Sequence, residues 1–382
     1  MRSIHFVHSF SKLSETFIYD YVTSLQDQEV DVEVLTFNRL NREERPFEPV
    51  TKISLSWWNV TRIWNIIRDN ILGRDTETSA WPAYRKRIKE KVLDEKPDVL
   101  HAHFGPMGVL LAPVAKEFDI PLIVTFYGYD ISEIIRRDFW KQAYQELADI
   151  ASYVTVLSEE MKERALGVGF SKDQIKVVHL GTRIDNIQYR QPSYPISKLL
   201  SIGRLAEKKG HLDTLQAFKL VLDRSDRALQ LNIIGDGDLR PELEEYIQRN
   251  NLQNHVQLLG RLPHSQVVEQ LKNADTFVLN SKTASSGDKE GTPTVLVEAQ
   301  AAGLPCISTF HSGIPEIIPE ENHRFLAEEA NVQQIISNMI DLLNASEKEV
   351  IEVSKRGRKR VEEAFDVVGE ASKFKLLYEE LI

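Results

Sequence analysis

The residues most able to do chemistry form the segment Glu290-Gly291-Thr292-Pro293-Thr294, with a second carboxylate at Glu298. An apolar run predicts a strand over 275–280, and apolar spacing predicts a helix over 292–302 that Thr292 caps and Pro293 opens. Free backbone N–H groups at a helix start favour an anion, and Gly291 lets a ligand approach closely. We therefore predict a phosphate site, with two carboxylates about 10 Å apart, at ~1.5 Å per residue, for sugar and ribose hydroxyls.

Two cations follow another predicted strand, over 198–202. Arg204 and Lys209 come just after it, beside Gly203, and Lys208 is their neighbour. A diphosphate that departs in a group transfer gains negative charge, which two cations stabilise. The alternative is a solvated basic turn.

Two further turns follow the strands predicted over 229–234 and 255–259. The first holds Gly235 and Asp236 within Gly-Asp-Gly-Asp. Its Asp-x-Asp pattern would suit a metal, but Asp and Gly after an apolar strand are more typical of a tight turn. The second turn holds Arg261 and Leu262.

The first half of the chain also carries polar groups near predicted strand ends. His101 and His103 alternate along the strand predicted over 97–103, so both lie on one side of it. They could form a metal pair, but the sequence shows no third ligand. Tyr127 and Asp130 follow the strand predicted over 121–126, where Asp130 can orient a hydroxyl group.

The segment Ser14-Glu15-Thr16 follows the first predicted strand, over 3–8. Ser14 is also a suitable cap for a helix that runs from Thr16 onward.

The elements that position these residues alternate between apolar strands and amphipathic helices, at a period of about thirty residues. Besides those named, strands are predicted over 31–36, 153–157, 175–179 and 304–308, and helices over 209–224, 239–250, 264–273 and 331–345. Such alternation is typical of parallel sheets covered by helices, an α/β fold. We predict an N-terminal domain (1–185), a linker (186–197), a C-terminal domain (198–360) and closing helices (361–382) that cross back to the N-terminal domain.

Together, these motifs resemble the retaining glycosyltransferases of family 4. Glu290 and Glu298 resemble the family's Glu-x7-Glu motif, and the resemblance runs from about Ile4 to Glu316. It implies the GT-B fold, in which two Rossmann-like parallel-sheet domains face each other across a cleft. The start Ser-Glu-Thr-Phe is similar to that of the exopolysaccharide branch, although the family's usual glycine pair after the first strand is absent.

The resemblance implies a role for each matching residue. The implied catalytic residues are Arg204 and Lys209 on the donor diphosphate, His103 on the donor sugar, Glu290 and Asp130. The other implied donor-binding residues are Gly291, Thr292, Pro293, Thr294, Glu298, Gly203, Gly235, Asp236, Arg261 and Leu262. The implied acceptor side consists of Ser14, Glu15, Thr16 and Tyr127, the last standing where many members have histidine.

The implied activity is retaining transfer of a hexose from a UDP- or GDP-linked sugar to a sugar hydroxyl. The acceptor would be an oligosaccharide or a lipid-linked glycan in bacterial polysaccharide biosynthesis, and no metal or other cofactor would be required. Two alternatives stay open: a sugar-nucleotide 2-epimerase of the same fold, and a non-catalytic partner subunit.

Composition narrows the class of protein. The 382 residues are 42% apolar and 27% charged, which is typical of globular domains. Cys306 is the single cysteine, so neither an intrachain disulfide nor a cysteine metal cluster can form. A net charge of -10 argues against nucleic-acid binding, and without a signal peptide or a long apolar run we expect a cytoplasmic protein.

One stretch has a different balance of charge. Residues 52–91 hold nine Lys or Arg against four Asp or Glu, together with Trp57, Trp58, Trp64 and Trp81. Aromatic and basic side chains suit an anionic membrane surface, here the inner face of the plasma membrane. An amphipathic helix packed on the core is the alternative.

Overall fold

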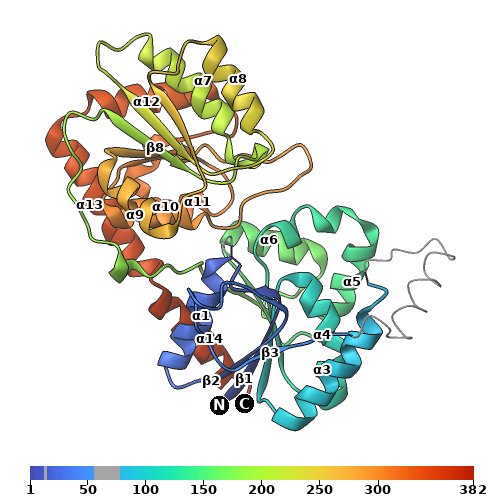
Figure 1. Ribbon diagram of the computed structural model, residues 1–382. Coiled ribbons are helices and arrows are strands. Elements are labelled where there is room, and N and C mark those ends of the chain that lie inside the picture. The colour runs from blue at the N-terminus through green and yellow to red at the C-terminus, as the bar shows by residue number, and fades with distance from the viewer. Residues whose placement is uncertain (13–14, 56–77) are drawn as a thin grey trace. The chain divides into compact units, whose positions relative to one another are not determined.

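The computed structural model describes residues 1–12, 15–55 and 78–382 (Figure 1). The chain divides into two compact units. Unit 1 comprises Met1–Val156, Lys162–Val178 and Glu370–Ile382, and unit 2 comprises Leu157–Met161 and His179–Gly369. Each unit is built around one parallel sheet.

Unit 1 contains a seven-stranded sheet in the order β3-β2-β1-β4-β5-β6-β7, and its strand pairings are parallel. The strands are β1 (Arg2–Phe10), β2 (Asp31–Arg39), β3 (Val50–Lys52), β4 (Val99–His103), β5 (Leu122–Thr125), β6 (Tyr153–Val156) and β7 (Ile175–Val177). The order reverses between β1 and β4, which places a switch point in the middle of the sheet.

Helices cover both faces of this sheet (Figure 1). They are α1 (Thr16–Asp27), α3 (Trp81–Glu95), α4 (Gly105–Phe118), α5 (Asp138–Ala148), α6 (Glu159–Val168) and the C-terminal α14 (Val367–Glu379). The α1 and α14 helices pack together through Tyr21 and Phe374, whose ring centroids are 5.1 Å apart. The last helix of the chain thus contributes to the core of unit 1.

Unit 2 contains a six-stranded parallel sheet in the order β10-β9-β8-β11-β12-β13. Its strands are β8 (Lys198–Ile202), β9 (Gln230–Ile234), β10 (Val256–Gly260), β11 (Thr276–Val278), β12 (Cys306–Thr309) and β13 (Leu326–Ala327). Here the order reverses between β8 and β11.

Two hydrophobic clusters lie on the two faces of this second sheet. One is formed mainly with α7 (His211–Leu222), α8 (Arg240–Arg249) and α12 (Val332–Asn344). The other is formed mainly with α9 (His264–Asn273), α10 (Thr294–Ala302), α11 (Ile314–Ile317) and the end of α13 (Glu347–Ala364). A parallel sheet buried on both faces explains why its strands read as short continuous apolar runs.

The predicted α/β class with two Rossmann-like parallel sheets is confirmed. The strands predicted over 198–202, 229–234 and 255–259 agree with β8, β9 and β10 to within one residue at each end. The edge strands β3 and β13 were not predicted, because three and two residues are too few to show a periodic pattern.

The described part of the basic stretch favours packing against the core. Trp81 is buried, with its ring centroid 5.9 Å from that of Trp140. Arg85 donates a hydrogen bond to the carbonyl of Leu110. Lys91, another basic residue of α3, forms an ion pair with Glu33, with 2.9 Å between Nζ and a carboxylate oxygen. Trp57, Trp58 and Trp64 lie outside the described residues.

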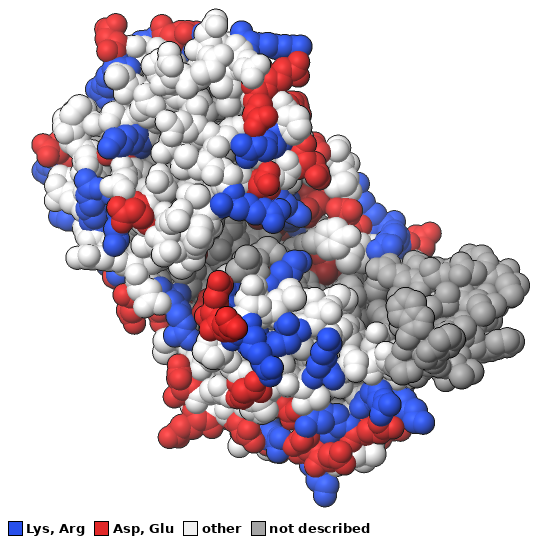
Figure 2. All heavy atoms as spheres, in the orientation of Figure 1, with Lys and Arg blue, Asp and Glu red and all other residues white. Residues whose placement is uncertain are grey.

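Charges on the described surface are mixed. On the face in view in Figure 2, basic and acidic side chains are interspersed. Among the described residues, no helix combines the length and apolarity that crossing a bilayer requires.

Gly303 ends α10 with a φ of 95°, and a Cβ at this position would lie 2.1 Å from the carbonyl oxygen of Arg190. We expect Gly303→Ala to lower the free energy of unfolding by about 2 kcal/mol or more, because the left-handed conformation and the close backbone both penalise a side chain. Urea denaturation measures the change. Gly369→Ala is the control, since nothing lies within 4 Å of its added Cβ, and an equal loss in both variants would contradict this explanation.

Candidate functional site

The sequence motifs of unit 2 meet at the switch point of its sheet. Ligands of open parallel sheets bind beyond the carboxyl ends of the strands, where the strand order reverses. The chain leaving β8 carries Gly203, Arg204 and Lys209, and the loop leaving β11 carries Glu290. The fold thereby joins two motifs that are 81 residues apart.

Glu290 is a buried carboxylate held between two lysines. Its Oε2 atom accepts a hydrogen bond from Lys209 Nζ at 3.0 Å, and Lys208 Nζ lies 3.8 Å from Oε1. Burial alone would raise the pKa of Glu290, but the charges of Lys209 and Lys208 outweigh it and lower the pKa to about 2. Glu290 is therefore an anion at neutral pH.

The second carboxylate oxygen of Glu290 is available to a ligand. Oε1 is buried and has no hydrogen-bond partner among the described residues. Lys208 is directed mainly to Asp288, with 2.9 Å between Nζ and Oδ2. A buried acceptor without a donor is costly, so a ligand hydroxyl at Oε1 would be stabilising.

His311 and Glu329 hold the backbone of the Glu290 loop. The N–H of Glu290 donates to His311 Nε2 at 3.1 Å, and His311 Nδ1 lies 2.6 Å from Oε1 of Glu329. A neutral imidazole that accepts at Nε2 must carry its proton on Nδ1, so Glu329 sets the tautomer. Burial would raise the pKa of Glu329, but hydrogen bonds from His311 and from the N–H of Thr283 lower it to about 2.

Sequence reasoning missed His311 and Glu329. His311 lies 21 residues beyond Glu290 and follows a different strand, and Glu329 lies a further 18 residues on. No local pattern connects the three residues, and only the fold of unit 2 brings them together.

Close backbone packing shapes the turns beyond β8 and β9. A Cβ on Gly235 would lie 1.9 Å from the carbonyl oxygen of Gly203, and one on Gly203 would lie 3.2 Å from the Lys209 side chain. The carboxylate of Asp236 accepts the N–H of Gly237 at 2.9 Å, and the N–H of Arg240 donates to the carbonyl of Gly237 at 3.1 Å, which closes a turn after β9 as the sequence predicts. Arg204 is exposed beside these turns.

The start of α10 differs from the prediction. Pro293 occupies the N-cap position and the helix begins at Thr294, so the prediction that Thr292 caps the helix is wrong. The Thr292 hydroxyl donates instead to the carbonyl of Leu157 at 3.2 Å, an acceptor that the sequence does not reveal. Gly291 is buried before the helix and Glu298 is half-buried within it.

Other donor and acceptor candidates lie just after β10 and at the start of α1. Arg261 is exposed and Leu262 half-buried beyond β10. Glu15 precedes α1, which begins at Thr16, and its carboxylate pairs with Lys12 at 2.7 Å. Ser14 lies outside the described residues.

In unit 1, histidines occupy the switch point between β1 and β4. His103 Nδ1 lies 2.6 Å from the Tyr127 hydroxyl, and His103 Nε2 lies 3.0 Å from Nδ1 of His5. Both ring nitrogens are engaged, so a contact from the His103 ring to a sugar would require an exchange of partners. Burial lowers the pKa of His5 to about 3 and the pKa of His101 and His103 well below the usual value.

The fold supplies the third histidine that the sequence did not indicate. Ligand atoms of His5, His101 and His103 lie within 4.8 Å of one another, a donor set that can hold a metal ion. His101 is also engaged at both nitrogens, by the hydroxyls of Tyr378 and Thr125, each at 2.6 Å. A metal would have to displace these hydrogen bonds.

Asp130 fixes the turn that follows β5 by accepting hydrogen bonds from backbone N–H groups. Its Oδ1 accepts the N–H groups of Tyr127 and Gly128 at 2.9 and 3.0 Å, and its Oδ2 accepts the N–H of Gly105 at 2.9 Å. Burial raises the pKa of Asp130 to about 6, against the opposing effect of these N–H groups. The carboxylate thereby fixes Tyr127 relative to the start of α4.

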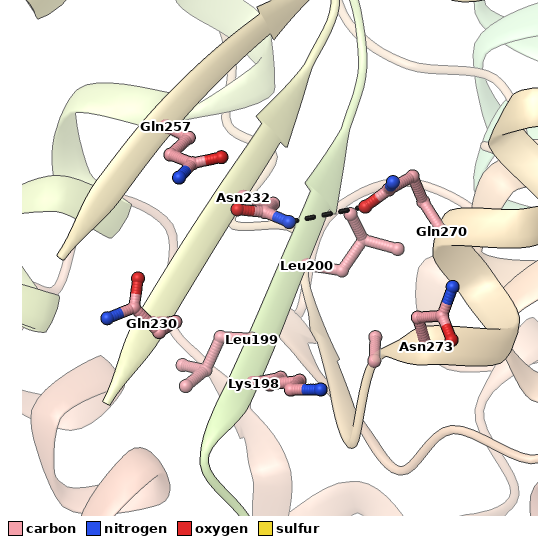
Figure 3. Close-up of a pocket in the computed structure, with 9 residues that line it drawn as sticks. Lys198, Leu199, Leu200, Gln230, Asn232, Gln257, Gln270 and Asn273 are labelled. Atoms are coloured by element: carbon pink, nitrogen blue, oxygen red, sulfur yellow. Dashed lines mark hydrogen bonds between the residues drawn. The ribbon is translucent and has the colours of Figure 1, made fainter. Parts of the chain in front are cut away.

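A separate hollow of about 220 Å³ opens over β8 and β9 (Figure 3). It is lined by Lys198, Leu199, Leu200, Gln230, Asn232, Gln257, Gln270, Asn273 and Ala274. Lys198 and Gln230 are the first residues of their strands, whereas Arg204 and Glu290 follow carboxyl ends. The hollow is therefore not the predicted phosphate site.

We expect Asp130→Asn to destabilise unit 1 by about 1–3 kcal/mol, because one oxygen that accepts a backbone N–H becomes an amide donor. The pKa raised to about 6 means that the protonated acid is favoured in the folded state, so wild-type stability falls as pH rises through 6. The difference between wild type and variant should therefore narrow from pH 5 to pH 7 in urea denaturation. A difference that widens would indicate a lowered pKa.

Two variants test whether Glu329 stabilises the Glu290 loop through His311. We expect Glu329→Leu to weaken the hydrogen bond from the Glu290 N–H to His311, because His311 loses the acceptor that fixes its tautomer. Glu329→Gln retains an oxygen at that place. In backbone amide hydrogen exchange, the N–H of Glu290 should exchange roughly tenfold faster in the Leu variant only. Equal protection in both variants would show that Glu329 does not act through His311.

Comparisons with known proteins agree with these motifs. The model of glycosyltransferase family 4 matches residues 14–186, and the model of glycosyl transferases group 1 matches residues 195–360. Together the two models span most of the chain.

Related proteins match over nearly their full length. The putative colanic acid biosynthesis glycosyltransferase WcaL of Escherichia coli is 27% identical, over 94% of this chain and 95% of its own. The amylovoran biosynthesis glycosyltransferase AmsK of Erwinia amylovora is 29% identical, over 96% of both. A crystal structure of Anabaena HepE with UDP and glucose matches all of both chains with a TM-score of 0.78 and 17% identity, which shows a shared fold. The chain therefore belongs to glycosyltransferase family 4, and is a glycosyltransferase with the GT-B fold of two parallel-sheet domains.

Proposed function

We propose that this protein transfers a hexose from a UDP- or GDP-linked sugar to a sugar hydroxyl in bacterial exopolysaccharide biosynthesis, with retention of configuration. The observation that carries the proposal is the buried Glu290 carboxylate, paired with Lys209 and with one oxygen unpartnered, at a sheet switch point. The names of the colanic acid and amylovoran relatives support the pathway, and the UDP and glucose bound by HepE support the donor class.

The donor diphosphate would lie beside Lys209 and Arg204. Lys209 already faces the anion Glu290, and Arg204 is exposed at the same strand end. The nine-residue α10 helix presents the N–H groups of its first turn close to Gly291. These groups would neutralise the charge that builds on the departing diphosphate.

The sugar would be oriented by Glu290. Because its pKa of about 2 keeps it ionised, Glu290 accepts hydrogen bonds and cannot serve as a general acid. Its unpartnered Oε1 would accept from a hexose hydroxyl. Glu298 in α10 would take the ribose hydroxyls.

The transfer would take place on one face of the sugar. The bond from the anomeric carbon to the diphosphate oxygen breaks while the acceptor oxygen bonds to that carbon on the same side, and the acceptor proton passes to the departing diphosphate. Lys209 and Arg204 would supply the positive charge, so we propose that no metal is needed. The acceptor would be an oligosaccharide or a lipid-linked glycan.

The test is a panel of UDP- and GDP-hexoses with a glycan acceptor, in EDTA and then in magnesium. We expect one nucleotide series to raise the melting temperature and to yield a glycoside whose anomeric coupling in NMR matches the donor, at the same rate in EDTA. An epimer formed without acceptor would instead show the 2-epimerase, and no binding at all would favour a partner subunit.

Two variants test whether the transfer takes place at this site. Glu290→Gln removes the charge with little change in shape, and Arg204→Ala removes the exposed cation. We expect each to lower kcat/KM by about 10²-fold or more, as loss of a transition-state contact does. The matched controls are Glu245→Gln and Arg249→Ala, an exposed ion pair in α8, which should leave the rate unchanged. Full activity in both site variants would contradict the proposal.

A further inference from the structure

A continuous chain of hydrogen bonds runs through the core of unit 1. It links seven side chains in the order Tyr127, His103, His5, Tyr378, His101, Thr125 and Thr155. The successive distances between donor and acceptor atoms are 2.6, 3.0, 3.3, 2.6, 2.6 and 2.5 Å. The chain joins β1, β4, β5 and β6 to the C-terminal helix α14.

The three histidines in this chain are neutral, because burial lowers the pKa of His5 to about 3 and depresses the pKa of the other two. A neutral imidazole donates through one nitrogen and accepts through the other. All six ring nitrogens are engaged, and the bond between His103 and His5 couples their tautomers directly. The Tyr378 hydroxyl couples His101 to them when it accepts from one of its two histidines and donates to the other. The chain then has two arrangements, with all three protons on Nε2 or all three on Nδ1.

The two arrangements differ in what Tyr127 can offer to a ligand. With the protons on Nε2, Tyr127 donates to His103 Nδ1 and presents only lone pairs. With the protons on Nδ1, His103 donates to Tyr127, and the hydroxyl proton of Tyr127 is free to be donated. Both arrangements hold the same number of protons, so neither carries a net charge. Going from one to the other requires one proton to enter at the Tyr127 end and one to leave at the threonine end.

Tyr127 is placed where a ligand would bind. It is half-buried, two residues after the end of β5 and beside the switch point between β1 and β4. Phe17 and Phe104 hold its ring, with centroid distances of 4.7 and 4.6 Å. The hydroxyl of Tyr127 is therefore fixed in position while its hydrogen-bonding role can change.

We propose that this hydrogen-bond chain lets Tyr127 act as donor or acceptor toward the acceptor-sugar hydroxyl, and that Tyr378 is a positioning residue for Tyr127. The inference rests on the proposed function, which supplies the acceptor sugar. Tyr378 is the link because its hydroxyl contacts both His5 Nε2 and His101 Nδ1, although 373 and 277 residues separate it from them.

Tyr378→Phe cuts the chain while keeping the ring, which stands edge-on to His5 and His101 with centroids 6.1 and 5.9 Å away. At saturating donor, we expect about a tenfold loss in kcat/KM for the acceptor and an unchanged KM for the donor. Tyr153→Phe is the matched control, because its hydroxyl bonds Glu380 at 3.0 Å outside the chain, and it should keep wild-type values. Wild-type acceptor kinetics in Tyr378→Phe would overturn the inference and leave the proposed function standing.

Nitrogen-15 NMR of the histidine rings tests the chain without any turnover. We expect three neutral imidazoles that share one tautomer at pH 7, and in Tyr378→Phe a tautomer of His101 that no longer follows that of His5. A charged ring, or opposite tautomers in the wild type, would overturn the inference. So would zinc chloride, if it bound at one equivalent and shifted all three rings, since the histidines would then be metal ligands.

Discussion

The buried ion pair between Glu290 and Lys209 is the interaction on which the candidate site depends. A carboxylate removed from water is stable only with a close cation and hydrogen bonds, so the loop after β11 and the turn after β8 must keep their relative positions. His311 and Glu329 hold that loop from one side, and close backbone packing at Gly235 holds that turn. The geometry of the candidate site follows from keeping this one charge compensated.

The two units use their switch points differently. In unit 2 the switch point is lined with charged side chains, which include Glu290 and Lys209. In unit 1 it is lined with neutral rings and hydroxyls, because burial prevents His5 and His103 from taking up a proton. A charged surface suits a diphosphate, whereas a neutral network that can donate or accept suits an uncharged glycan.

Most of the fold could be predicted from the sequence because βα units leave local patterns. Short apolar runs gave β8, β9 and β10, and glycine with polar residues marked the turns after them. The residues that complete the sites could not be predicted. His5 and Tyr378 bond each other across 373 residues, and His311 bonds Glu290 in a loop that follows a different strand. Thr292 bonds the carbonyl of Leu157 and does not cap its own helix.

The assignment of residues 370–382 to unit 1 has a consequence for synthesis on the ribosome. Unit 1 is translated first, but α14 packs on α1 and Tyr378 completes the partners of His5 and His101. Until α14 leaves the exit tunnel, His5 and His101 of the nascent unit 1 each lack one hydrogen-bond partner, and an apolar face stays uncovered. Completion of its core is therefore delayed until unit 2 and residues 370–382 have been made, and a product that ends before α14 would be left open to proteolysis.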